Sequence, residues 1–342
     1  MSVAWQFYAI TLLVYFGVNL MAGWAINFQY GVAGILNFGF IIFQSIGAYV
    51  ASVTTLGASQ PGGYQQYILG ATLPWPLSIV AAGIAGGLLA IVVGSFALRP
   101  IGRAFQGIVL LIVAVIASDL VSTEFGWFDG TNGLAAIPKP LQGALGLGLV
   151  SYGWFYVGLT AVFCVVTYFV IRRCSTGPYG RKLRALRENA RSASALGVNV
   201  RKETMVVFVV GGVIAAISGA VLVQFLGAWA PSTWMPSETF LYIAAIVVGG
   251  VDNMAGVALG VAILYTGILE GVQYFPSIGV GNLVGAVQWM AIGILVALFL
   301  WFRPQGMVPQ RRRRLSTRVR TVRGSRANVV GVRERDDKNV LT

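Results

Sequence analysis

Long runs of apolar residues without a charged side chain recur along this chain. Residues 77–98, 204–226 and 283–302 contain no Asp, Glu, Lys or Arg, and each run reaches the length of about 20 residues that a helix needs to cross a bilayer. Soluble domains carry about 25% charged residues, whereas this chain of 342 residues carries 10%. We therefore expect an all-α, polytopic integral membrane protein.

The apolar segments and the distribution of charge predict about nine transmembrane helices, within a range of about 8–10. Residues 31–56 are glycine-rich and form either a full span with a broken start or a partly re-entrant segment. Residues 240–274 are long enough for two crossings, interrupted near Gly249, Gly250 and Asp252. The other expected spans are 5–27, 77–98, 103–125, 151–171, 204–226 and 283–302.

The basic residues are concentrated in two segments beside apolar spans. Of the 24 Lys and Arg residues, nine lie in 172–203 and twelve in 303–342. Loops with this excess of positive charge stay on the cytoplasmic side of a membrane. We therefore expect a multi-pass protein of the cell (inner or plasma) membrane, with its N-terminus outside and its C-terminus in the cytoplasm.

Two regions follow from this charge distribution. Residues 1–308 form the membrane domain, and residues 309–342 form a polar, basic tail that we expect to be disordered and cytoplasmic. Arg311–Arg314 are placed to attract anionic membrane lipid. Since both basic segments flank apolar spans, the positive-inside rule explains them, and nucleic-acid binding is not expected.

Several kinds of chemistry are excluded by residues that the chain lacks. It contains no histidine and only two cysteines, so His-dependent catalysis and His- or Cys-ligated metal sites are not expected. A Gly-x-x-x-x-Gly-Lys-Ser/Thr phosphate-binding loop is also absent. The sequence therefore predicts neither an enzyme nor a cofactor or metal site of its own.

The segment 177–203 combines a basic surface with an apolar stripe. Leu183, Leu186, Ala193 and Leu196 recur at helical spacing, and Gly197 is a helix stop signal. This pattern predicts one amphipathic helix on the cytoplasmic side. From the residues alone, the helix either lies on the lipid surface or docks into a groove of a partner protein.

Four segments, in this order, resemble the permease subunits of branched-chain (hydrophobic) amino acid ABC importers. The first is the glycine-rich stretch from Gly31 to Gly39, and the second is Gly180–Val200. The third pairs Gly249-Gly250 with Gly256 and Gly260, and the fourth is Phe302-Arg303-Pro304-Gln305-Gly306. The resemblance covers residues 10–308. The chain differs from the family pattern at Phe40, at Ser194 and at Val251-Asp252-Asn253.

This resemblance implies a subunit that moves branched-chain or other hydrophobic amino acids inward by alternating access. ATP would be bound by separate ABC ATPase subunits, and a paralogous permease subunit and an extracytoplasmic substrate-binding protein would complete the importer. The loop 177–203 would carry the coupling helix that contacts the ATPase. The contact residues implied are Leu183, Leu186, Ala193, Leu196 and Gly197, with Arg184, Arg187 and Glu188 at the rim. Two alternatives stay open: a permease for urea or short amides, and a secondary transporter driven by an ion gradient.

Polar residues inside apolar runs are candidates for the substrate pathway. A carboxylate in a membrane helix normally faces a cavity or a partner, and Asp119 lies well inside the span that begins at Arg103. Asn37 and Gln44 are polar residues within apolar runs. Gly34 is one of the glycines around residues 31–39, where a broken helix would expose backbone groups to the charged ends of a zwitterionic substrate. The alternative for Asn37, Gln44 and Asp119 is a hydrogen bond between helices, or a position near a helix end at the membrane interface.

Overall fold

The computed structural model describes residues 3–59, 63–98, 102–270, 281–303 and 305–308. The chain divides into two units, residues 1–310 and 311–342. The basic tail predicted at 309–342 lies outside the described residues. All elements below belong to the first unit.

Helices account for nearly all regular structure in the described part of the chain, which confirms the predicted all-α, polytopic class. Six helices are long and apolar enough to cross a membrane, and two more apolar helical segments are shorter. The six lie within α1 (Val3–Asn27) continued by η1 (Phe28–Val32), α3 (Trp75–Ala97), α4 (Arg103–Thr123), α7 (Leu149–Ser175), α10 (Val200–Leu226) and α13 (Gly281–Phe302). The two shorter segments are α2 (Ile41–Leu56) and α12 (Met254–Val261) continued by η4 (Ala262–Glu270).

Glycine allows the central helices α2, α3 and α10 to pack closely. A Cβ atom on Gly47 of α2 would lie 2.1 Å from the carbonyl oxygen of Ala216 on α10. A Cβ atom on Gly86 of α3 would lie 2.3 Å from the Cβ of Ala216. Small residues commonly allow such contact between membrane helices. In an apolar stretch of 18 residues, 72% of the residues of α10 are accordingly buried, compared with 17% in α4 and 6% in α13.

The broken start predicted near residues 31–39 is present. After α1, the chain forms the π-helical turn η1, continues without regular structure, and begins α2 only at Ile41. Gly34 lies in the left-handed region with φ of +73°, which favours glycine. π-helical turns are rare and often occur at functional sites.

The break predicted at Gly249-Gly250 is also present. Helix α11 (Pro236–Gly249) turns through residues 250–253 into α12. The two helices touch through glycine, since a Cβ atom on Gly260 would lie 1.9 Å from the carbonyl oxygen of Ala245. After α13, the chain returns to this turn, where Met307 N–H donates to Val248 O (2.9 Å) and Val308 N–H donates to Gly249 O (3.0 Å).

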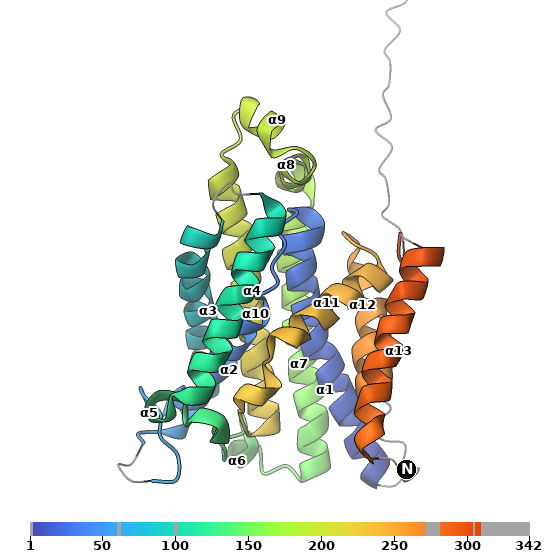
Figure 1. Cartoon of the computed structure of the whole chain (residues 1–342). Coiled ribbons are helices and arrows are strands. Elements are labelled where there is room, and N and C mark those ends of the chain that lie inside the picture. Colours follow the sequence, from blue (N-terminus) through green and yellow to red (C-terminus); the bar gives the residue numbers. More distant parts are fainter. Residues whose placement is uncertain (1–2, 60–62, 99–101, 271–280, 304, 309–342) are drawn as a thin grey trace, which may run out of the picture. The chain divides into compact units, whose positions relative to one another are not determined.

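Short helices mark the two ends of the membrane domain (Figure 1). Helices α8 (Gly177–Glu188) and α9 (Ala190–Ala195) lie at one end, here called the α8 end, and α5 (Phe125–Phe128) and α6 (Gln142–Leu145) lie at the opposite end. Aromatic rings gather at that opposite end, where Tyr49 packs beside Phe128 and Trp229. The short 3-10 turns η2 (Gly130–Asn132) and η3 (Pro231–Thr233) belong to the same region.

Candidate functional site at the α8 end

The amphipathic segment between α7 and α10 folds as two short helices. Pro178 lies in the first turn of α8, where its missing N–H is not needed. Asn189 has extended backbone, and its side-chain oxygen caps α9 by accepting from Ser192 N–H (3.0 Å). Gly197 has φ of +84°, as expected of a helix stop. The prediction of one continuous helix was therefore wrong at Asn189, because this residue ends one helix and caps the next.

The apolar stripe of this segment is divided between the interior and the surface. Leu183 and Leu186 have exposed fractions of 0% and 4%, and Ala193 is also buried. Leu196 is 85% exposed and Gly197 is exposed. The two leucines therefore anchor α8 on the chain's own body. The outer face of α8 carries Arg181, Ala185 and Glu188, at spacings of four and three residues.

Arg184 ties α8 to the turn between α11 and α12. Its Nε and Nη2 donate to the two carboxylate oxygens of Asp252 at 2.8 and 3.0 Å, and its Nη1 donates to Ser175 O at 3.1 Å. The Asp252 side chain is only 8% exposed. These hydrogen bonds with Asp252 raise the pKa of Arg184 above its ordinary value. The pair has the bidentate geometry that makes arginine–carboxylate contacts strong and directional.

Arg187 ties the same helix to the broken start of α2. Its Nη1 donates to the carbonyl oxygen of Gly31 in η1. Its aliphatic stem packs on Gly34, where an added Cβ atom would lie 2.7 Å from Arg187 Cγ. Gly34, which the sequence predicts along the substrate pathway, thus lies against α8.

A third tie joins α8 to the first turn of α10. Lys182 Nζ lies 2.5 Å from a carboxylate oxygen of Glu203 and 5.4 Å from the ring centre of Tyr179. Burial, followed by the neighbouring Glu203 carboxylate, raises the pKa of Tyr179 to about 12. The phenol therefore stays neutral over the physiological pH range.

The four sequence segments that carried the family resemblance meet around Asp252. The backbone N–H of Asp252 donates to Asn27 Oδ1 (3.0 Å), just before η1. Gly306 lies against Gly250, since a Cβ atom on Gly306 would be 2.6 Å from Gly250 Cα. We call Asn27, Gly31, Arg184, Arg187 and Asp252 the α8 junction. Sequence reasoning missed Asn27 and the role of Asp252, although the unusual Val251-Asp252-Asn253 turn was a signal.

The remaining pathway candidates differ in their surroundings. Asn37 and Gln44 have exposed fractions of 1% and are hydrogen-bonded within the protein. Asn37 Nδ2 donates to Gln29 Oε1 (2.9 Å), and Gln44 Oε1 accepts from the Tyr242 hydroxyl (3.2 Å). Asp119 is instead on the exposed face of α4.

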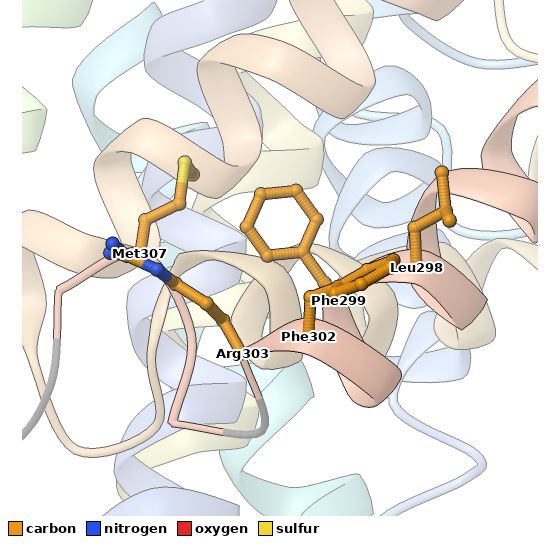
Figure 2. Close-up of a pocket in the computed structure, with 5 residues that line it drawn as sticks. All are labelled: Leu298, Phe299, Phe302, Arg303 and Met307. Carbon is orange, nitrogen blue, oxygen red and sulfur yellow. The ribbon is translucent and has the colours of Figure 1, made fainter.

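Neither of two hollows found in the described part of the chain is lined by any of the four predicted pathway residues. A cavity of about 220 Å³ lies between α2, α3 and α4 near Trp229 and Trp234. A second hollow of about 380 Å³ lies where α13 ends (Figure 2), lined by Leu298, Phe299, Phe302, Arg303 and Met307. Within the described residues no group of three His, Cys, Asp or Glu side chains could hold a metal ion.

Comparison with known proteins connects this architecture to one transport family. The family described as "Branched-chain amino acid transport system / permease component" matches residues 8–302. A probable branched-chain amino acid transport permease protein LivM of Methanocaldococcus jannaschii is 24% identical and covers 88% of this chain and 93% of its own length. No solved structure matches the chain.

Two high-affinity branched-chain amino acid permeases of Escherichia coli are also similar. LivM is 25% identical and covers 96% of this chain and 77% of its own length. LivH is 27% identical and covers 85% of this chain and 96% of its own length. The chain thus matches both paralogous permeases at comparable identity. Because the family match covers most of the chain and confirms the resemblance found in the sequence, this protein belongs to the permease components of branched-chain amino acid transport systems.

Proposed function

We propose that this chain is a membrane-spanning subunit of an ATP-binding cassette importer that moves branched-chain or other hydrophobic amino acids inward. Separate ATPase subunits bind and hydrolyse the ATP, so the permease needs no cofactor of its own. The observation that carries the proposal is the α8–α9 segment, which is anchored on its inner face and open on its outer face. The similarity to the LivM and LivH branched-chain amino acid transport permeases supports the substrate class.

The ATPase contacts the exposed side of α8 and α9. Among the predicted contact residues, Glu188, Leu196 and Gly197 are exposed, and Arg181 and Ala185 extend the same surface. The buried residues do not contact the ATPase directly. They hold the exposed surface in place by packing against the rest of the chain, and they are Leu183, Leu186 and Ala193. Arg184 and Arg187 make hydrogen bonds within the chain, and these bonds fix the inner side of α8 to its neighbours.

The α8 end faces the cytoplasm. Arg172 and Arg173 end α7 at this side, α8 and α9 add further arginines, and the segment after Arg303 packs on the α11–α12 turn. Such a concentration of basic residues is retained on the cytoplasmic side and attracts anionic lipid. The C-terminus then lies in the cytoplasm of the cell, and the end with α5 and α6 receives the substrate-binding protein.

The exposed face of α4 meets the second, paralogous permease subunit. This helix is only 17% buried, as expected of a helix at an edge of the chain, yet it carries the carboxylate of Asp119 on its exposed side. The poorly buried helix α13 exposes only apolar side chains and glycine over residues 285–302, as lipid contact requires. A carboxylate in the bilayer is costly without a polar environment, so Asp119 lines the pathway between the subunits.

Co-purification from native membranes tests the ATPase contact. The full-length tagged chain would be compared with Leu196→Asp and with Leu69→Asp, which changes a leucine that is 81% exposed at another site. Recovery of a P-loop ATPase with the wild type and Leu69→Asp, and its loss with Leu196→Asp, would support the proposal. Equal recovery with both variants would place the ATPase contact elsewhere.

Uptake by liposomes that contain the purified complex tests the substrate and the energy source. ATP-dependent uptake of labelled leucine, blocked by excess unlabelled leucine, is the expected result. Block by excess urea and not by leucine would favour the urea or amide permease. Transport by the isolated chain without ATP would favour the gradient-driven secondary transporter.

A further inference from the structure

Helix α8 has polar ties to both interrupted helices, through two arginines one helical turn apart. We propose that Arg184 and Arg187 are positioning residues that make α8, the α11–α12 turn and the broken start of α2 move together. The bidentate Arg184–Asp252 pair is the principal link. This inference rests on the proposed function, because it assigns to these residues the transfer of motion from the ATPase to the transport path.

The Arg184–Asp252 contact is able to hold α8 and the α11–α12 turn together when either of them moves. Both carboxylate oxygens of Asp252 are used, and the third bond of Arg184, to Ser175 O, reaches the end of α7. The Asp252 side chain is 8% exposed, whereas that of Arg184 is 37% exposed. Pulling α8 away would leave a buried carboxylate without its cation, which is strongly unfavourable. The turn must therefore follow the helix.

Asp252 carries this link further, to the end of α1. Its φ of +62° is in the left-handed region, and its N–H donates to Asn27 Oδ1 (3.0 Å). Asn27 is the last residue of α1 before η1. An added Cβ atom on Gly31 would lie 2.8 Å from Asp252 N, so only a glycine allows η1 to approach the turn this closely. One residue of the α11–α12 turn thus contacts α8 and α1 simultaneously.

Arg187 forms the second link, which joins α8 to the interrupted segment between α1 and α2. Its guanidinium donates to Gly31 O, while its stem touches Gly34. Three residues beyond Gly34, Asn37 donates to Gln29 Oε1, and Gln29 donates to Phe208 O on α10. A displacement of α8 is therefore passed to the irregular segment that begins α2. Such interruptions are the places where a helix can change its backbone angles with little disturbance elsewhere.

A variant that removes the charge of Asp252 and keeps its shape separates coupling from docking. Asp252→Asn suits this purpose, because asparagine tolerates the left-handed conformation. The full complex would be measured for ATPase recovery, ATP hydrolysis and uptake per ATP hydrolysed. We expect recovery and hydrolysis close to wild type, and uptake per ATP lowered about tenfold, within the range of about 5–150-fold typical of coupling between sites.

A matched control breaks a different ion pair of the same helix. Lys182→Gln removes the contact with Glu203 on α10, which involves neither interrupted helix. Its uptake per ATP should stay within about twofold of wild type, a difference below about 0.5 kcal/mol. Combining Arg184→Gln with Asp252→Asn should lower uptake per ATP no further than either change alone, because both remove one interaction.

A distance measurement covers the case in which a variant does not assemble with the ATPase. Spin labels at Ala185 on α8 and Ala255 on α12, both exposed positions, report whether the helix and the turn stay together in the isolated full-length chain. We expect a narrow distance distribution that broadens in Asp252→Asn and not in Lys182→Gln. A distribution unchanged by Asp252→Asn would overturn the link.

The two proposals fail in different ways. If the wild-type complex imports leucine with ATP and Asp252→Asn does so with unchanged uptake per ATP, the positioning role is refuted and the importer function stands. If the wild-type chain recruits no ATPase and shows no ATP-driven uptake, the importer function is refuted, and the mechanical role falls with it.

Discussion

Asn37 Nδ2 lies 2.9 Å from Gln29 Oε1, and both side chains are buried inside the membrane domain. Gln29 Nε2 donates in turn to the Phe208 carbonyl oxygen of α10 at 3.0 Å. Asn37 Oδ1 also accepts from Gly39 N–H (3.2 Å) just before α2 begins. These bonds satisfy polar groups that the helix interruption exposes, and they fasten the broken segment to the most buried part of the fold.

The first prediction concerns this buried relay of hydrogen bonds, in which Asn37 bonds to Gln29 and Gln29 bonds to Phe208. Asn37→Leu should lower the unfolding temperature in detergent, because it leaves Gln29 Oε1 and Gly39 N–H without partners at a cost of about 1–3 kcal/mol each. Thr123→Ala is the control, since its hydroxyl bonds only within exposed α4. The unfolding temperature of each variant is measured by heating samples in detergent and monitoring the remaining folded protein by size-exclusion chromatography. Equal unfolding temperatures for the two variants would show that the relay contributes nothing.

The second prediction concerns the crossing of α2 and α10. Gly47→Ala should prevent normal folding or lower stability markedly, because the new methyl group would lie 2.1 Å from a backbone oxygen that cannot move aside. Gly158→Ala on α7 has nothing within 4 Å and should be neutral or stabilising by up to about 1 kcal/mol. The yield of monodisperse protein and its thermal stability check both variants. A well-folded Gly47→Ala variant would contradict the close crossing.

Much of the architecture could be predicted because it depends on local features. The apolar runs predicted the long helices, and clustered glycines predicted both interruptions, at residues 31–39 and 249–250. Burial of Leu183 and Leu186 could not be predicted, because an amphipathic stripe looks the same whether it faces its own chain or a partner. The Arg184–Asp252 pair joins residues 68 positions apart, and sequence periodicity carries no information on such a distant contact.

The third prediction separates contact from backbone strain at Gly34, on which Arg187 of the α8 junction packs. Gly34 and Gly177 both have φ of +73°, but only Gly34 faces Arg187. Gly34→Ala should therefore reduce leucine uptake much more than Gly177→Ala, because both variants strain the backbone and only one also pushes Arg187 away. Uptake by reconstituted complexes of equal ATPase content is the measurement. If both variants lose the same fraction of uptake, strain alone accounts for the effect.

The fourth prediction concerns orientation in the membrane. With both native cysteines replaced by serine, a single cysteine at Leu196 should react with a membrane-impermeant maleimide only after the cells are permeabilised. A cysteine at Leu69 should react in intact spheroplasts. Leu69 is exposed and belongs to the loop between the C-terminal end of α2 and the start of α3, which we propose lies on the outer side of the membrane. Labelling detected by a gel shift distinguishes the two cases. The reverse pattern would place the α8 end outside and would remove the basis for an ATPase contact there.

The fifth prediction tests the exposed carboxylate of α4. Asp119→Asn should lower leucine uptake by reconstituted complexes while ATPase recovery and chromatographic behaviour stay normal, because the residue lies on an exposed helix face and has no part in the α8 junction. Asp119→Glu should keep most of the uptake, since the charge is retained. Thr123→Ala, one turn further along the same exposed face, controls for a small polar change. A carboxylate that lines the pathway predicts this order of activities, with wild type and Thr123→Ala highest and Asp119→Asn lowest. Full uptake by Asp119→Asn would instead indicate that the carboxylate lies in the polar interface of the membrane, where neutralisation costs little.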